Sequence, residues 1–173
     1  MTLVEVLVAT GLGTVVLAAV MSMTVYSARS FAAVSNYVDM DMRSRHALDK
    51  MSQEIRQADG LTPNGFSATQ LVFTGTDPMT TAPYTLTYTY DPARKTLTRS
   101  RGGESESLLT QCDSLVWSMY KRNMTNGTDE PIPTSDPRTC KLIKLDWVCS
   151  RSILGKSANT ESVQSAEIVV RKK

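Results

Sequence analysis

The chain has 173 residues, with 19 basic and 17 acidic side chains and a formal net charge of +2. This near balance, together with an aromatic content of only 6%, argues against a nucleic-acid-binding surface, so nucleic acid is not an expected partner. The length suits one folding unit with an extension, and three stretches differ in pattern: residues 1–26, 27–59 and 60–173.

The first stretch, residues 1–26, is an apolar segment without Lys, Arg, Asp or Pro, and Glu5 is its one ionised side chain. A helix rises about 1.5 Å per residue, so about 25 residues cover a bilayer core of about 30 Å. The stretch shows neither the basic region nor the cleavage site of a secretory signal peptide, so we expect a retained helix. A carboxylate inside such a helix is costly, which indicates a function for Glu5.

The helical pattern continues through residues 27–59 without an interrupting proline. Charged residues, Glu54 among them, occupy most faces of this stretch, whereas apolar residues recur at spacings of three or four. These apolar residues predict one stripe: Phe31, Val34, Val38, Met42, Leu48, Met51, Ile55 and Ala58. Gly60, with a proline shortly after it, predicts a C′ residue, so we expect one helix over about residues 2–59.

Beyond Gly60 the hydrophobic pattern changes to a period of two, which predicts strands. Gly102-Gly103 is expected to break the chain, and residues 123–137 to form a long polar loop. Because no further helices alternate with the strands, the sequence predicts an α+β fold, a long N-terminal α-helix packed on an antiparallel β-sheet. The expected strands are 70–74, 84–90, 96–101, 114–120, 141–148 and 163–170.

The three cysteines, Cys112, Cys140 and Cys149, do not have the spacing of a zinc site. If strands 114–120 and 141–148 pair as a hairpin, the numbers of opposing residues sum to about 262, which brings Cys112 near Cys149. Cys140 and Cys149 lie too far apart along one extended strand to bridge. We therefore predict a Cys112–Cys149 disulfide, which an exported domain in an oxidising compartment would form.

Catalytic and metal-binding patterns are not found in the sequence. His46 is the only histidine and lies on a charged helical face, where we expect contact with solvent or with another subunit. The chain has no G-x-S-x-G, P-loop or G-x-G-x-x-G motif, so we expect no enzyme activity and no cofactor. Asp129, Glu130 and Asp136 could in principle hold calcium, but they lack a D-x-D-x-G pattern and are read as an ordinary surface loop.

The first nine residues, Met1-Thr-Leu-Val-Glu5-Val-Leu-Val-Ala9, resemble the mature N-terminus of type IV pilins and type II secretion pseudopilins. That family reads Phe-Thr-Leu-x-Glu-x-Leu-x-Ala after prepilin peptidase removes a short basic leader, and Met1 stands here for the usual Phe. The resemblance implies an already processed chain with an N-methylated amine on Met1. A weaker similarity, to minor pilins and the minor pseudopilin J type, rests on residues 46–58, 88–91, 97–99 and 145–147.

This resemblance implies the α/β roll of pilins and a structural subunit of a type IV pilus-like surface filament. Glu5 of a resident subunit would pair with the amine of Met1 of the incoming one; the alternative is that Glu5 accepts from the free N–H groups of its own helix. The implied partners are copies of the chain itself, prepilin peptidase, an assembly ATPase and a platform protein. Subunits would sit in the bacterial inner membrane before joining an extracellular filament, or a periplasmic one for a pseudopilin.

Two other functions remain open from the sequence. The later similarity favours a minor, tip-type pilin or a type II secretion pseudopilin, and a membrane-anchored binding or adhesin module could use the same helix as a tether.

A further expectation concerns Gly11, Gly13 and Thr14, because family members often lose helical structure in this region within filaments. Many carry a proline near position 22, where this chain has Ser22, so any loosening would depend on the glycines. Close packing between helices explains the same glycines equally well.

Overall fold

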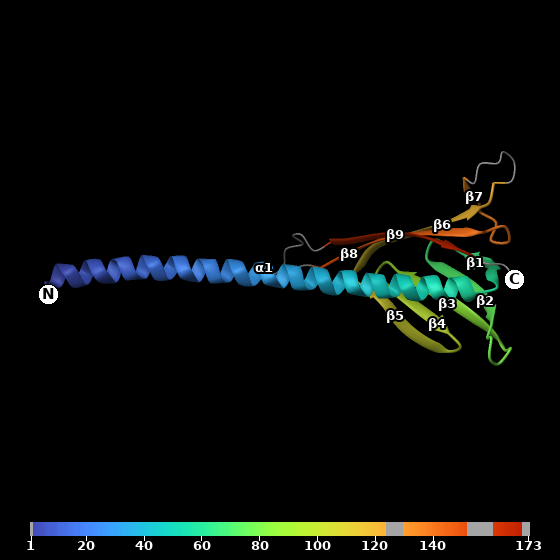
Figure 1. Ribbon diagram of the computed structural model, residues 1–173, viewed down its shortest axis with the longest axis horizontal. Coiled ribbons are helices and arrows are strands. Elements are labelled where there is room, and N and C mark those ends of the chain that lie inside the picture. The colour runs from blue at the N-terminus through green and yellow to red at the C-terminus, as the bar shows by residue number, and fades with distance from the viewer. Residues whose placement is uncertain (1, 124–129, 152–160, 171–173) are drawn as a thin grey trace.

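The computed structural model describes residues 2–123, 130–151 and 161–170. One long helix, α1 (Leu3–Gln57), is followed in these residues by nine strands. The second half of α1 packs on the strands, whereas its first half projects beyond them (Figure 1). The strands are β1 (Gly60–Phe66), β2 (Gln70–Thr76), β3 (Pro83–Asp91), β4 (Thr96–Arg101), β5 (Glu104–Thr110), β6 (Cys112–Lys121), β7 (Ile132–Pro133), β8 (Leu142–Ser150) and β9 (Glu161–Val169).

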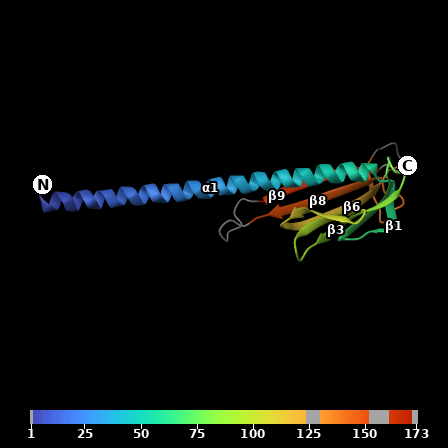
Figure 2. The same ribbon diagram turned by 90° about the horizontal axis from the view of Figure 1, so that it is seen from below.

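The strands form two antiparallel sheets, with the orders β1–β2–β3–β4–β5 and β7–β6–β8–β9. Helix α1 packs against both sheets, chiefly against β9 of one and β5 of the other (Figures 1 and 2). The chain passes from one sheet to the other at Gln111, whose φ of 61° lies in the left-handed region. The predicted α+β fold is confirmed, and its sheet is divided in two.

The end of α1 differs from the sequence prediction. The helix ends at Gln57, and Ala58 is an extended cap residue whose N–H donates to the carbonyl oxygen of Glu54 at 3.0 Å. The next N–H, of Asp59, already donates to Thr74 of β2 at 2.8 Å. Gly60 therefore begins β1 and is not a left-handed C′ residue, because the chain leaves the helix directly into sheet pairing.

Three strands, β1, β5 and β7, are not expected from the sequence. Strand β1 contains Pro63 and Gly65, which are turn-type residues, and its pairing with β2 is irregular in register. Gly102 and Gly103, with φ angles of 61° and 89°, form the tight turn between β4 and β5 rather than a break in the chain. The short strand β7 lies within the predicted polar loop.

The core lies between α1 and the inner faces of the two sheets. In β8 the alternation predicted from the sequence is confirmed, because Ile143, Leu145 and Trp147 are buried. From the helix, Met51 and Ile55 enter the core as predicted. Other large and fully buried side chains come from both sheets: Leu71, Phe73, Leu86, Tyr88, Leu97, Leu109 and Ile168.

Four residues of the predicted helical stripe face away from this core, whereas Leu48 and Ala58 pack with it as predicted. Phe31 is 73% exposed and Met42 is 65% exposed, whereas Met40, Ser44 and Ala47 are buried on the sheet side. At about 100° per residue, the exposed residues lie about 150° around the helix from the buried face, so the pattern combines two stripes on nearly opposite faces. We term the exposed set the outer stripe: Phe31, Val34, Val38 and Met42.

Candidate functional site

The N-terminus of α1 is closed by a capping box. Thr2 is the N-cap residue, and its backbone N–H donates to Oε2 of Glu5 at 2.8 Å. The N–H of Glu5 in turn donates to the Thr2 hydroxyl oxygen at 3.4 Å. In the single chain Glu5 thus accepts from its own helix terminus, which is the intramolecular role considered above. Met1 lies outside the described residues, so its pairing with Glu5 stays a prediction.

The apolar segment that follows is an uncovered helix. Every residue over 2–26 is exposed, and the helix is long and apolar enough to cross a membrane. Gly11, Gly13 and Thr14 are helical, and the Thr14 hydroxyl donates to the carbonyl oxygen of Gly11 at 2.8 Å. A Cβ atom on either glycine would meet no atom within 4 Å outside the local helix. Loosening at these residues concerns an assembled filament and stays a prediction.

The outer stripe extends this apolar surface beyond residue 26. All four of its side chains are exposed on the face of α1 that points away from the sheets. Charged side chains such as Asp39 and Arg43 occupy the adjoining positions and form an ion pair at 3.2 Å. The helix is thus apolar on all sides at first and then apolar on two separate faces, one of which has no partner in the described residues.

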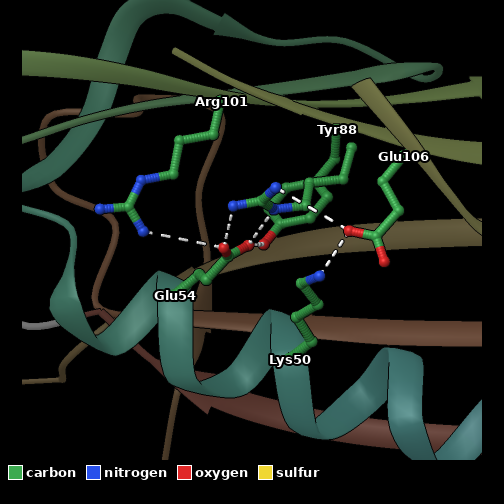
Figure 3. Close-up of polar contacts among 6 residues, drawn as sticks. Lys50, Glu54, Tyr88, Arg101 and Glu106 are labelled. Carbon is green, nitrogen blue, oxygen red and sulfur yellow. Dashed lines mark hydrogen bonds and ion pairs between the residues drawn. The ribbon is translucent and has the colours of Figure 1, made fainter. Parts of the chain in front are cut away.

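A buried ionic cluster fastens the other face of α1 to the first sheet. Glu54 is only 7% exposed, although the sequence pattern placed it among the charged faces. Its carboxylate accepts from Nε of Arg99 at 2.8 Å and from Nη2 of the same side chain, which makes a bidentate pair. It also accepts from the Tyr88 hydroxyl at 2.8 Å (Figure 3).

Charged neighbours extend this cluster towards solvent. Lys50 forms an ion pair with Glu106 of β5, and Arg101 approaches Glu54 at 3.8 Å (Figure 3). The guanidinium of Arg101 also lies 4.0 Å from the centre of the Tyr84 ring. Hydrogen bonding from Lys50 lowers the pKa of the Glu106 carboxyl. We term the set the Glu54 cluster: Lys50, Glu54, Tyr88, Arg99, Arg101 and Glu106.

Hydrogen bonding with Glu54 raises the pKa of Arg99, and burial raises the pKa of Tyr88. Both groups therefore keep their protons. Because the bonds of the cluster have specific directions, it fixes both the rotation and the axial position of α1 on the first sheet.

A second attachment lies where α1 leaves the sheets. Arg151, at the end of β8, donates to Asp39 at 2.8 Å and to the side-chain oxygen of Asn36 at 3.4 Å. Gln164 of β9 donates to Asp41 at 3.1 Å. The hydrogen bond from Arg151 is the main cause that lowers the pKa of Asp39. These contacts hold the turns of α1 around residues 36–41, where the helix leaves the sheets and its uncovered half begins.

The sequence could have indicated the Glu54 cluster. Glu54 lies three residues after Met51 and beside Ile55, which places it on the inner face of the helix. Arg99 lies two residues after Leu97 in β4, so both side chains point to the same face of the strand. An inward acid on the helix and an inward arginine on a strand predict a buried pair, because an isolated buried charge is too costly. The prediction missed the pair because it placed Glu54 with the other charged residues of the helix, outside the apolar stripe.

The register predicted for a hairpin of strands 114–120 and 141–148 is confirmed. Leu115 pairs with Trp147, whose numbers sum to 262, and Cys112 lies opposite Cys149. All three cysteines are buried and are present as thiols, so the disulfide itself stays a prediction.

The other residues considered from the sequence as catalytic or metal-binding candidates do not come together in the described part of the chain. His46 is exposed, as expected. Asp129 lies outside the described residues, whereas Glu130 is exposed and Asp136 accepts from the N–H of Arg138 at 2.9 Å within a turn. No group of three or more metal-ligating side chains occurs among the residues that the structure describes.

Comparisons with models of protein families, with curated proteins and with solved structures found no match to this chain.

Proposed function

We propose that this chain is a structural subunit of a type IV pilus-like surface filament, assembled through its N-terminal helix with Glu5 paired to the N-terminal amine of a neighbouring subunit. The supporting observation is the outer stripe, which continues an apolar surface well beyond the length that a membrane anchor needs. Before assembly the subunit would reside in the bacterial inner membrane, with its sheets outside.

The length of the apolar surface separates this proposal from a simple tether. A bilayer core of about 30 Å takes about 20 helical residues. From Leu3 to Met42 the helix extends about 60 Å, so the outer stripe lies beyond one bilayer core. Exposed apolar side chains in water are favourably buried, and neighbouring copies of the same helix supply a matching apolar surface over this whole length.

The capping box suits the proposed role of Glu5. Thr2 engages Oε2, which leaves Oε1 without a hydrogen bond from the described residues and open to a cation. The proposed cation is the amine of a neighbouring Met1. Such a pair gives register more than stability, because desolvation cancels much of the Coulomb attraction.

The two attachments of α1 support the same proposal. A filament held together through its helices must transmit the position of each helix to the sheets that it carries. The Glu54 cluster fixes the axial position of α1, and the Arg151 contacts with Asp39 and Asn36 fix its direction of exit.

Two variants test the proposal in cells that assemble the native chain into filaments. The first replaces residues 2–26 by an unrelated membrane-spanning sequence, and the second changes all four residues of the outer stripe to serine. We expect both variants to insert in the membrane with folded sheets and to form no filaments, as judged by electron microscopy. Normal surface function of the first variant would instead identify a tethered binding module.

A further inference from the structure

We propose that the outer face of the first sheet binds a neutral, extended polysaccharide through an array of threonine and serine hydroxyl groups. The proposal concerns this sheet alone and does not depend on filament assembly. It starts from the alternation along β3 and β4, in which buried residues such as Leu86 and Leu97 alternate with hydroxyl residues that point outward. We term the outward set the hydroxyl face: Thr85, Thr87, Thr89, Thr96, Thr98 and Ser100.

The pairing of the strands aligns these side chains in rows. Thr89 of β3 lies opposite Thr98 of β4, and Thr87 lies opposite Ser100. Strand β5 extends the second row, because its Ser105 lies opposite Ser100. Neighbouring strands are about 4.8 Å apart, and alternate residues along one strand are about 6.7 Å apart. The hydroxyl groups therefore form a regular array with one spacing across the strands and another along them.

The hydroxyl groups of this face are open to a ligand. All six residues are exposed or half-buried, and none of their side chains is hydrogen-bonded within residues 2–123, 130–151 and 161–170. Thr62 of β1 differs, because its hydroxyl donates to the carbonyl oxygen of Val72 at 3.2 Å. Each hydroxyl can donate one hydrogen bond and accept two. The face thus presents donors and acceptors together, and solvent or a ligand must satisfy them.

The charged residues of β3 and β4 do not lie within this face. Arg99 and Arg101 point to the inner side of the sheet, where they belong to the Glu54 cluster. Asp91 lies at the end of β3 and caps its own turn, where its carboxylate accepts from the N–H of Ala93 at 2.9 Å. The hydroxyl face is therefore polar and uncharged.

The second sheet shows how a solvated face is built in the same molecule. The outward residues of β8 and β9 include Lys144, Asp146 and Glu167, and Lys144 lies 3.7 Å from Asp146. Such charges keep an exposed sheet soluble and prevent association with other sheets. The hydroxyl face has no charges of this kind, which indicates that it meets a neutral surface as well as water.

A neutral polysaccharide has the matching chemistry. It repeats hydroxyl groups along an extended chain, and these groups also donate and accept. A chain that lies along β3 and β4 would exchange hydrogen bonds with both strands, while the threonine methyl groups contact the C–H faces of the sugar rings. A polyanion or a polycation would find no opposite charge here. Each neutral hydrogen bond contributes little, so binding depends on several contacts acting together.

The experiment measures retention of the full chain on microcrystalline cellulose. The protein is held in polyoxyethylene detergent micelles, because a glycoside detergent would compete. Thr87→Val/Thr89→Val/Thr98→Val removes three hydroxyls and keeps β-branched side chains that suit a strand. Loss of one neutral hydrogen bond weakens binding by roughly two- to tenfold, so we expect at least about tenfold weaker binding.

Two further variants control for folding and position. Thr85→Val/Ser100→Ala changes other hydroxyls of the face and should also weaken binding. Ser114→Ala/Ser118→Ala, on the outer face of β6, should bind as the native chain does. The fluorescence of Trp117 and Trp147 checks that the sheets of each variant are folded.

We expect soluble cellohexaose to displace the native chain from cellulose, and added salt to leave binding unchanged, because no charge takes part. Absence of native retention, or equal retention of both threonine variants, would overturn the proposal. Stronger retention on phosphocellulose that salt removes would show electrostatic adsorption instead. Native dimers that the valine variant cannot form would identify a second copy as the occupant and would equally overturn it.

Discussion

The Glu54 cluster allows a prediction whose size follows from its contacts. Replacing Glu54 with leucine leaves the guanidinium of Arg99 buried without its bidentate partner. Breaking a buried pair in this way costs about 3–5 kcal/mol. The Tyr88 hydroxyl also loses its acceptor, but Glu106 remains 3.9 Å from Arg99 and offsets part of the loss. We therefore expect Glu54→Leu to lower the free energy of unfolding by about 4 kcal/mol.

The matched variant removes both charges. In Glu54→Leu/Arg99→Met, the apolar side chains fill a similar volume and no isolated charge remains, so most of the lost stability should return. The exposed pair of Asp39 and Arg43 serves as the control, and Arg43→Ala should cost less than about 1 kcal/mol.

The assay is urea unfolding of the full chain in detergent micelles, followed by the fluorescence of Trp117 and Trp147. If the double variant is as unstable as Glu54→Leu alone, the ionic pair is not the reason for the loss, and the cluster does not hold α1 as described.

Three further predictions concern other parts of the chain. Gly11→Ala/Gly13→Ala should add about 1 kcal/mol of helix stability per residue. If the native helix loosens on assembly, filaments of this variant should show stronger amide-exchange protection at residues 11–14, and unchanged protection would refute the loosening. Gly65→Ala should lower the free energy of unfolding by about 1–3 kcal/mol, because its Cβ would lie 2.4 Å from a backbone oxygen of β2. Gly11→Ala, at a helical position with open space around it, should not lower it, and an equal loss in both variants would contradict the steric explanation. Hydrogen bonding from Lys95 lowers the pKa of Asp113, so this contact stabilises the fold above the unfolded pKa of about 4 and its contribution is lost as the pH falls through the lowered value. Asp113→Asn should therefore reduce the loss of stability between about pH 5 and pH 2 in urea titrations, and an unchanged pH dependence would contradict this assignment.

Much of the fold could be predicted from local pattern. The long helix, the α+β class and the β6–β8 register followed from apolar periodicity, because the residues of β8 alternate cleanly between core and solvent. Strand β1 could not be predicted in this way, since Pro63 and Gly65 suit a turn and only the pairing with β2 makes them extended. Local propensity gives no information on that pairing.

The candidate site likewise has a part that could be predicted from local pattern and a part that could not. Glu5 stands out because it is the only charge in an apolar segment, which is a property of the sequence alone. The partner of Glu54 is 45 positions away on a strand, so its identity depends on how the helix lies across the sheets. The outer stripe was not separated from the buried face for a related reason. Leu48 lies at helical spacing between Met42 and Met51, so the sequence shows one continuous stripe where the structure has two different faces.

The central claim, that the charge of Glu5 directs assembly, is tested most directly by Glu5→Gln. A glutamine can replace glutamate in a capping box, so this variant keeps the contact with Thr2 and removes only the charge. The measurement is the yield of sheared filaments at equal levels of membrane-inserted subunit, with Thr2→Ala as the variant that weakens the cap and keeps the charge. We predict a sharp loss of filaments for Glu5→Gln and a smaller loss for Thr2→Ala. Native yield from Glu5→Gln would contradict the charge pair and leave Glu5 as a helix cap alone.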